Sequence, residues 1–124
     1  MSDFEHARRF ALSLPGVTEE PHFDLSSYRV RGKIFATAPP GGSHLHVFLD
    51  ELAVEAAVAE DPAAFEPLRW GRQVRGVRIL LAAAAAERVT ELIDDAWRRR
   101  APRQLVAEFD AGQIRPDPAA RAPD

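Results

Sequence analysis

The sequence contains no cysteine and a single lysine, Lys33, among its 124 residues. A chain without thiols forms no disulfide, zinc–thiolate or iron–sulfur site and has no cysteine nucleophile. Long apolar runs are also missing: the longest, residues 79–86, falls far short of the ~20 residues that a membrane-spanning helix needs. The amino terminus is acidic rather than basic and apolar, so we expect no signal peptide and predict a cytoplasmic protein.

The net charge is low, at −3, and the sequence pI is about 5.8. The chain therefore lacks the overall basic character of many nucleic-acid-binding proteins, and an anionic partner would have to meet a local patch. Its length, with 46% hydrophobic residues, suits one globular domain with its own core, which we place at residues 1–110. Residues 111–124 hold three prolines and no aromatic residue, which predicts a disordered tail.

Hydrophobic periodicity and capping residues predict the helices. They are expected over residues 4–14, 51–60 and 84–99, with a further short helix after Pro102. Ser2 and Glu5 have the spacing of a capping box at the start of the first helix, and Asp50 is placed to cap the second.

Strand-forming residues and turn signals predict the sheet. Strands are expected over residues 27–30, 33–37, 44–49 and 74–81. Arg31–Gly32 is predicted to turn the first hairpin, and Gly76 to allow a bulge or a close backbone approach. Between the helix expected at residues 51–60 and the strand expected at residues 74–81, Asp61–Pro62 indicates a short helical turn through Phe65, followed by an irregular segment to Arg72. The order α-βββ-α-β-α-α predicts an α+β fold, with helices on one face of an antiparallel sheet of about four or more strands.

No pattern in the sequence predicts catalysis, a cofactor or a metal site. His44 and His46 alternate on one strand face, but a third ligand would have to come from His6, His22 or a carboxylate. Adjacent carboxylates such as those of residues 94–95 do not face each other, and the serines lack the context of an activated nucleophile. We therefore expect a non-enzymatic protein without a cofactor.

Arginines are concentrated in one short segment, although the net charge of the chain is negative. Residues 50–68 hold six acids and no base, whereas residues 69–82 hold four arginines and no acid. A second basic cluster lies in and beside the first predicted hairpin. Arginine side chains bind phosphate well, and a neighbouring tryptophan can stack on a base. Alternatively, the arginines are ordinary surface residues neutralised by the nearby acids, and the tryptophan belongs to the core. The candidate DNA-binding residues are Arg31, Lys33, Trp70, Arg72, Arg75 and Arg78.

Two segments resemble the MmcQ/YjbR family of small bacterial proteins. They are Ala11-Leu-Ser-Leu-Pro-Gly-Val-Thr-Glu-Glu-Pro-His-Phe and Tyr28-Arg-Val-Arg-Gly-Lys-Ile-Phe-Ala. Later landmarks are Trp70–Gly71, the Gly76–Val77 step, and residues 95–103, so the resemblance covers about residues 4–107. Arg103 stands where the family often has a lysine.

This resemblance implies a fold similar to the CyaY/frataxin-like class and, because the family is described as having a double-wing topology, binding to duplex DNA. In such a topology, hairpin turns carry basic side chains to phosphates. Frataxin-like iron binding is the least favoured reading, because the first helix offers only Asp3 and Glu5 against Arg8 and Arg9.

A different function remains open beside DNA binding. The chain could be a small-molecule or protein-interaction module that uses a cleft near His22–Phe23 and Lys33. The candidate cleft residues are His22, Phe23, Lys33 and Trp97.

Overall fold

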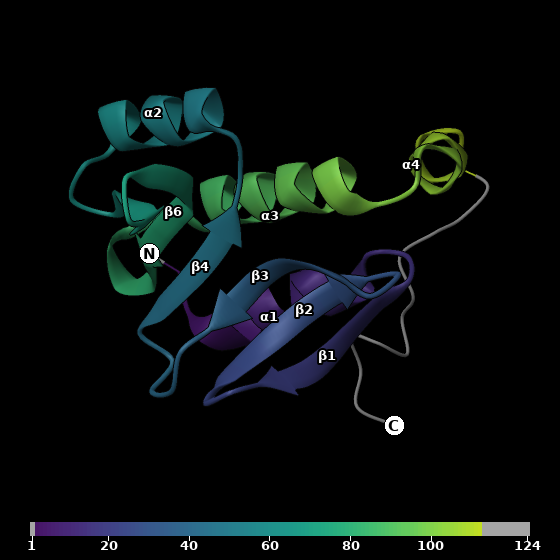
Figure 1. Ribbon diagram of the computed structural model, residues 1–124, viewed down its shortest axis with the longest axis horizontal. Coiled ribbons are helices and arrows are strands. Elements are labelled where there is room, and N and C mark those ends of the chain that lie inside the picture. Colours follow the sequence, from purple (N-terminus) through teal and green to yellow (C-terminus); the bar gives the residue numbers. More distant parts are fainter. Residues whose placement is uncertain (1, 113–124) are drawn as a thin grey trace.

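The computed structural model describes residues 2–112, which form six strands, four α-helices and one short 3₁₀ helix (Figure 1). Along the chain the elements are α1 (Phe4–Ser13), β1 (Val17–His22), β2 (Leu25–Val30), β3 (Lys33–Ala38), β4 (His44–Phe48), α2 (Glu51–Glu60), β5 (Phe65–Trp70), β6 (Gln73–Leu80), η1 (Leu81–Ala83), α3 (Ala86–Arg100) and α4 (Arg103–Asp110). Most of the expected tail, residues 113–124, lies outside the described residues. Ala111 and Gly112 form a turn after α4.

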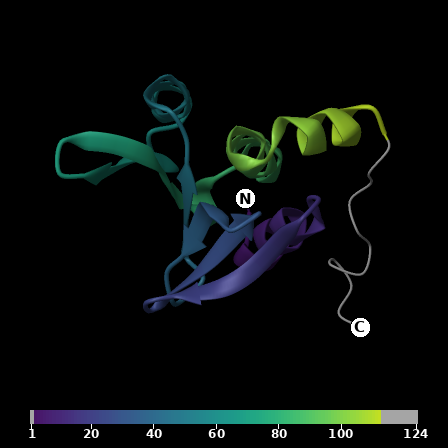
Figure 2. The same ribbon diagram turned by 45° about the vertical axis from the view of Figure 1, so that its right-hand side comes forward.

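All six strands belong to one antiparallel sheet with the order β1-β2-β3-β4-β6-β5. The helices α1 and α3 pack together against one face of this sheet, and α2 covers β5 and β6 (Figures 1 and 2). The predicted α+β class, with helices on one face of an antiparallel sheet, is confirmed. Within the described part of the chain, no helix is both long and apolar enough to cross a membrane.

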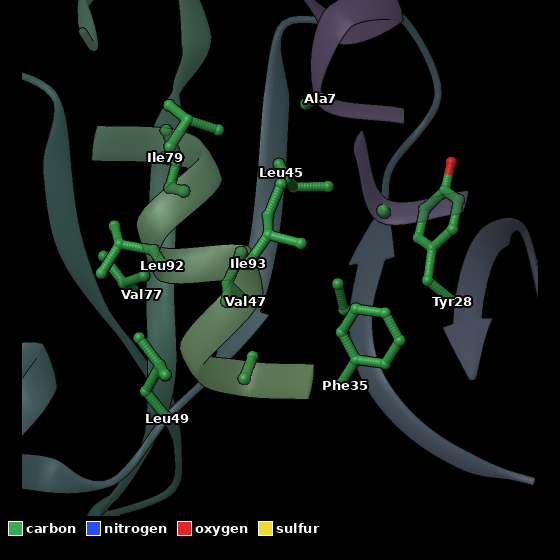
Figure 3. Packing of buried hydrophobic residues seen from close by; sticks show 14 of the residues in the cluster. Ala7, Tyr28, Phe35, Leu45, Val47, Leu49, Val77, Ile79, Leu92 and Ile93 are labelled. Atoms are coloured by element: carbon green, nitrogen blue, oxygen red, sulfur yellow. The ribbon is translucent and has the colours of Figure 1, made fainter. Parts of the chain in front are cut away.

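The hydrophobic core lies between the helices and the covered face of the sheet (Figure 3). Leu45 and Val47 of β4 point into it beside Leu92 and Ile93 of α3. Because side chains alternate along a strand, the neighbouring positions of β4, including His46, belong to the opposite face. No helix of the described residues 2–112 packs across that second face, which we call the open face.

Helix α1 begins one residue later than the capping box predicted. Asp3, not Ser2, is its N-cap, and the Asp3 carboxylate accepts a hydrogen bond of 2.8 Å from the backbone N–H of His6. Ser2 is instead buried, with its backbone N–H donating to the carbonyl of Leu81. The prediction for α2 is confirmed, since Asp50 accepts from the backbone N–H of Ala53.

Two strands, β1 and β5, were missed by the sequence analysis. The irregular segment expected after Phe65 is wrong, because that segment is the edge strand β5; only the turn before it, at residues 62–64, is helical in character. Both missed strands lie at the edges of the sheet, are largely exposed and contain a proline, Pro21 or Pro67. Edge strands need no alternation of apolar and polar residues, and proline is tolerated there because only one side of the strand is paired.

Gly76 brings β6 unusually close to β4. A Cβ atom at this position would lie 2.2 Å from the carbonyl oxygen of Val47. The register with β5 also shifts here: Leu68 pairs with Gly76 and Arg69 with Val74, which leaves Arg75 as the extra residue of a bulge. Both features that the sequence suggested for Gly76 are therefore present. A bulge redirects the side chain of the extra residue.

Candidate functional site: a cationic groove on the open face

A groove of about 830 Å³ extends from the open face past the end of β4 to the carboxyl end of α3. Its walls come from the β1–β2 turn, from β3 and β4, from the β5–β6 hairpin and from the carboxyl end of α3. Strands β3 and β4 share only two paired positions, Ala36 with Val47 and Thr37 with His46, whereas β4 and β6 share five. The short pairing means that β3 and β4 separate towards Lys33, and Lys33 and the α3 arginines line the groove on that side.

Four cationic side chains line the groove: Lys33, Arg75, Arg99 and Arg100. Within residues 2–112, none of them forms an ion pair. Two acids, Asp50 and Glu51, also line it, but the Asp50 carboxylate is already engaged in capping α2. The groove is thus a local basic site on a protein of net charge −3.

Strand pairing brings these cations together from distant parts of the sequence. Lys33 begins β3, and the antiparallel pairing of β3 with β4 places it at the end of the sheet where β4 finishes. At that same end Phe48 pairs with Gly76 near the start of β6, so the turns of the β2–β3 and β5–β6 hairpins lie at one end of the sheet. The carboxyl end of α3 supplies Arg99 and Arg100 to the same groove.

Three aromatic side chains accompany the charges. Phe23, in the β1–β2 turn, is 91% exposed, and Trp70, at the end of β5, is 59% exposed. Phe48 is on β4, which lies between β2 and β5 in the sheet. The Trp70 ring meets Phe48 edge to face, with ring centroids 6.1 Å apart. The guanidinium of Arg75 covers the Trp70 ring, with Cζ 4.9 Å from the centroid. Such a contact is a cation–π interaction, and it holds the exposed indole at the groove.

Phe23 also has an unfavourable backbone conformation. It is the first residue of the two-residue β1–β2 turn and has φ of 59°. In this left-handed region an L-residue pays roughly 1–2 kcal/mol that glycine does not. Burial of the side chain offsets little of this conformational cost, because the ring contacts His22 edge to face and is otherwise exposed to solvent.

Several residues predicted to bind DNA lie outside the groove. Arg31 and Arg72 are exposed at the two hairpin turns, and Arg31 has a positive φ of 52° in the turn that was predicted for it. Arg78 pairs with Glu66 on the neighbouring strand at 2.9 Å. Lys33, Trp70 and Arg75 do line the groove. The alternative expectation that acids neutralise the arginines therefore applies to Arg78, and Trp70 is not a core residue.

The predicted cleft is only partly present. His22, Phe23 and Lys33 line the groove, but Trp97 does not. Placing Trp97 in the cleft was wrong, because its side chain is fully buried and its indole N–H donates to the carbonyl of Pro15 at 3.0 Å. The helical stripe that contains Trp97 faces the core, and the sequence pattern does not distinguish a core tryptophan from one beside a cleft.

Arg99 and Arg100, at the carboxyl end of α3, are not among the candidate residues drawn from the sequence. One signal could have singled out Arg100. Arg100 lies three residues after Trp97 and seven residues after Ile93, so it continues the buried stripe of the helix. A charged residue in register with an apolar stripe indicates a partly buried position, and Arg100 indeed has a buried Nε without a hydrogen-bond partner among the described residues.

His46 lines the groove with a partly buried imidazole. Burial lowers its pKa below the usual value, and the nearby charge of Arg78 and His44 lowers it further. Its Nδ1 lies 3.4 Å from the hydroxyl of Thr37, and its Nε2 is buried without a partner in the described structure. No group of three or more His, Asp or Glu side chains among residues 2–112 is arranged to hold a metal ion.

A charged network anchors the hairpin that carries Phe23. The Glu19 carboxylate of β1 accepts two hydrogen bonds from the Arg8 guanidinium, at 2.8 and 2.9 Å, and one from the Tyr28 hydroxyl at 2.7 Å. The bond from Arg8 lowers the pKa of Glu19, whereas burial and the neighbouring carboxylate raise the pKa of Tyr28. The network fixes the β1–β2 hairpin to α1.

Comparison with known families identifies the group to which this chain belongs. The model of the YjbR family matches residues 12–99. The chain belongs to the YjbR family. This confirms the resemblance drawn from the sequence, and the matched range includes three of the four groove cations of this YjbR protein, while Arg100 follows it directly. Comparisons with curated proteins and with solved structures give no match.

Proposed function

We propose that this YjbR protein is a non-enzymatic, cytoplasmic DNA-binding module that contacts phosphates through the cationic groove and the adjacent hairpin turns. One observation carries the proposal: four cations that form no ion pair with any of residues 2–112, supplied by β3, β6 and α3, line a single groove. Separated segments of the chain contribute to this charge, so it is not the by-product of one amphipathic helix.

The phosphate contacts in this proposal differ from those expected from the sequence. Lys33 and Arg75 keep their role and are joined by Arg99 and Arg100. Arg31 and Arg72, exposed at the turns, extend the basic surface beyond the groove. Arg78 has a minor role, because its pairing with Glu66 places a carboxylate where a phosphate would approach.

A salt series of DNA binding tests this proposal. Four phosphate contacts predict a slope of log affinity against log salt of about −3.6 for duplex DNA and about −2.8 for single strands. Contacts made mainly to the backbone also predict similar affinity for duplexes of unrelated sequence. Absence of retention on any DNA at low salt, or binding that is insensitive to salt, would overturn the proposal.

The groove volume favours a second candidate, a small-molecule or protein-interaction module. A volume of about 830 Å³ is within the range of pockets that enclose small ligands, about 300–1,000 Å³. In this case the cations would recognise an organic anion. Saturable binding of small anions by calorimetry, together with no binding to any DNA, would favour this second function.

A further inference from the structure

We infer that the groove binds unpaired nucleotides, with a base against the exposed aromatic ring of Phe23 or of Trp70, which lie at different ends of the groove, and with phosphates near the groove cations. This inference rests on the proposed function, since it names what the cationic groove would accept. The nucleotide could be free or part of a single strand, because both present the same base and phosphate.

The first observation is the turn residue Phe23. A left-handed φ favours glycine or asparagine at this position, yet the chain has a bulky aromatic residue that is 91% exposed. Neither the backbone conformation nor the burial of the ring accounts for phenylalanine here. Strain of this kind persists at binding sites, where the side chain serves a ligand rather than the fold.

The second observation is another exposed aromatic side chain in the same groove. Trp70, from the hairpin at the other side of the sheet, lines the same groove and is also largely exposed. Its orientation is fixed by Arg75 over the ring and by the edge of Phe48. Sites for single-stranded nucleic acid combine such aromatic platforms with a cationic path for the backbone.

The exposed aromatic rings favour an unpaired base over a duplex. In a duplex the faces of the bases are stacked on their neighbours, so they are not free to stack on side chains. A duplex can meet the cations at the rim of the groove, but the aromatic rings would then gain nothing. The groove, at about 830 Å³, has room for a nucleotide.

The groove lining also includes polar side chains. His46 and Thr37 lie side by side in it, with His46 Nδ1 3.4 Å from the Thr37 hydroxyl. The edge of a base offers both donors and acceptors, which matches a lining that contains an imidazole, a hydroxyl and guanidinium groups.

The test compares the full chain on three probes at equal salt: a labelled single-stranded oligonucleotide, the same sequence as a blunt duplex, and a mononucleotide as competitor. We expect the single strand to bind at least several-fold more tightly than the duplex. Binding should also quench the fluorescence of Trp70, with the quenching lost in Trp70→Leu, because Trp97 is buried. Competition by the mononucleotide identifies a free nucleotide as sufficient, and its failure identifies the strand as the ligand.

Phe23→Gly is the decisive variant because it should fold better than the parent. Relief of the positive φ predicts a Tm higher by a few degrees. Loss of one stacking contact predicts about tenfold weaker binding of the single strand, with binding of the duplex unchanged. Phe23→Tyr, which keeps an aromatic ring, should retain the affinity.

The outcomes separate the inference from the proposed function. Equal affinity for single strand and duplex, with no effect of Phe23→Gly, would overturn the inference and leave DNA binding in place. Binding of the mononucleotide alone, with loss on Phe23→Gly, would support the inference and overturn DNA binding. No binding of any of the three probes would overturn both.

Discussion

The guanidinium of Arg75 lies over the indole of Trp70, with Cζ 4.9 Å from the ring centroid, whereas Arg78, three residues along the same strand, pairs with Glu66 at 2.9 Å. On a regular strand, residues three apart point to opposite faces. The bulge next to Gly76 adds one residue to β6 and so brings Arg75 to the same open face as Arg78. Arg75 lines the groove beside Trp70, whereas Arg78 lies outside the groove beside Glu66.

Arg75→Ala and Arg78→Ala therefore form a matched pair, since both remove one arginine from β6. We expect Arg75→Ala to lower DNA affinity and to make the salt slope less steep by about 0.7–0.9, the value for one lost phosphate contact. Arg78→Ala should change the slope little, because Glu66 already neutralises this charge. Fluorescence anisotropy over a salt series measures both. Equal effects of the two variants would contradict the assignment.

Gly76→Ala should be strongly destabilising. The added methyl group would lie 2.2 Å from the Val47 carbonyl oxygen, and paired backbone on both sides prevents relief. Overpacking of this severity predicts a loss of about 3 kcal/mol or more of unfolding free energy, measured by urea denaturation. Gly71→Ala is the control, because nothing lies within 4 Å of its added Cβ and only the positive φ of 61° is strained. That variant should lose about 1–2 kcal/mol, and a comparable loss in both would argue against the close approach.

Glu19→Gln should make the stability of the protein less dependent on acid pH. The pKa of Glu19 is lowered in the folded state by its hydrogen bonds from Arg8, so the folded carboxylate binds a proton less readily than the unfolded one. Its stabilising contribution is therefore present above the unfolded pKa of about 4.3 and is lost as pH falls through the lower folded value.

At pH 7 we expect Glu19→Gln to cost about 1–2 kcal/mol, because the charged hydrogen bonds to Arg8 are partly exposed to solvent. The difference from the parent should shrink between pH 5 and pH 3. Urea denaturation at a series of pH values gives this comparison. A difference that is constant across the range would show that the ion pair does not stabilise the fold.

Trp97→Phe should weaken the fold and leave DNA binding intact. The change removes the indole N–H that donates to Pro15 and leaves a cavity in a fully buried position. We expect a loss of about 2–3 kcal/mol in unfolding free energy. Affinity measured well below the Tm of the variant should equal that of the parent. Weaker binding by folded Trp97→Phe would restore this tryptophan to the binding site.

Much of the fold was predictable because it depends on local signals. The apolar stripe of α3, the Asp50 cap and the Arg31–Gly32 turn each specify an element within a few residues of sequence. The edge strands β1 and β5 could not be found in this way. Their conformation is set by hydrogen bonds to β2 and β6, and their side chains are too exposed to show a buried face.

The α+β class, the main helices, the family and the cluster of arginines could all be read from the order of residues along the chain. The three-dimensional packing was needed to show which arginines form no ion pair within residues 2–112, that Trp70 is exposed and Trp97 buried, and that Phe23 and Arg100 line the same groove. Local elements follow from interactions between residues near in sequence. A binding groove depends instead on strand register, a bulge and the end of a helix, which together bring residues as distant in sequence as Phe23 and Arg100 to one surface.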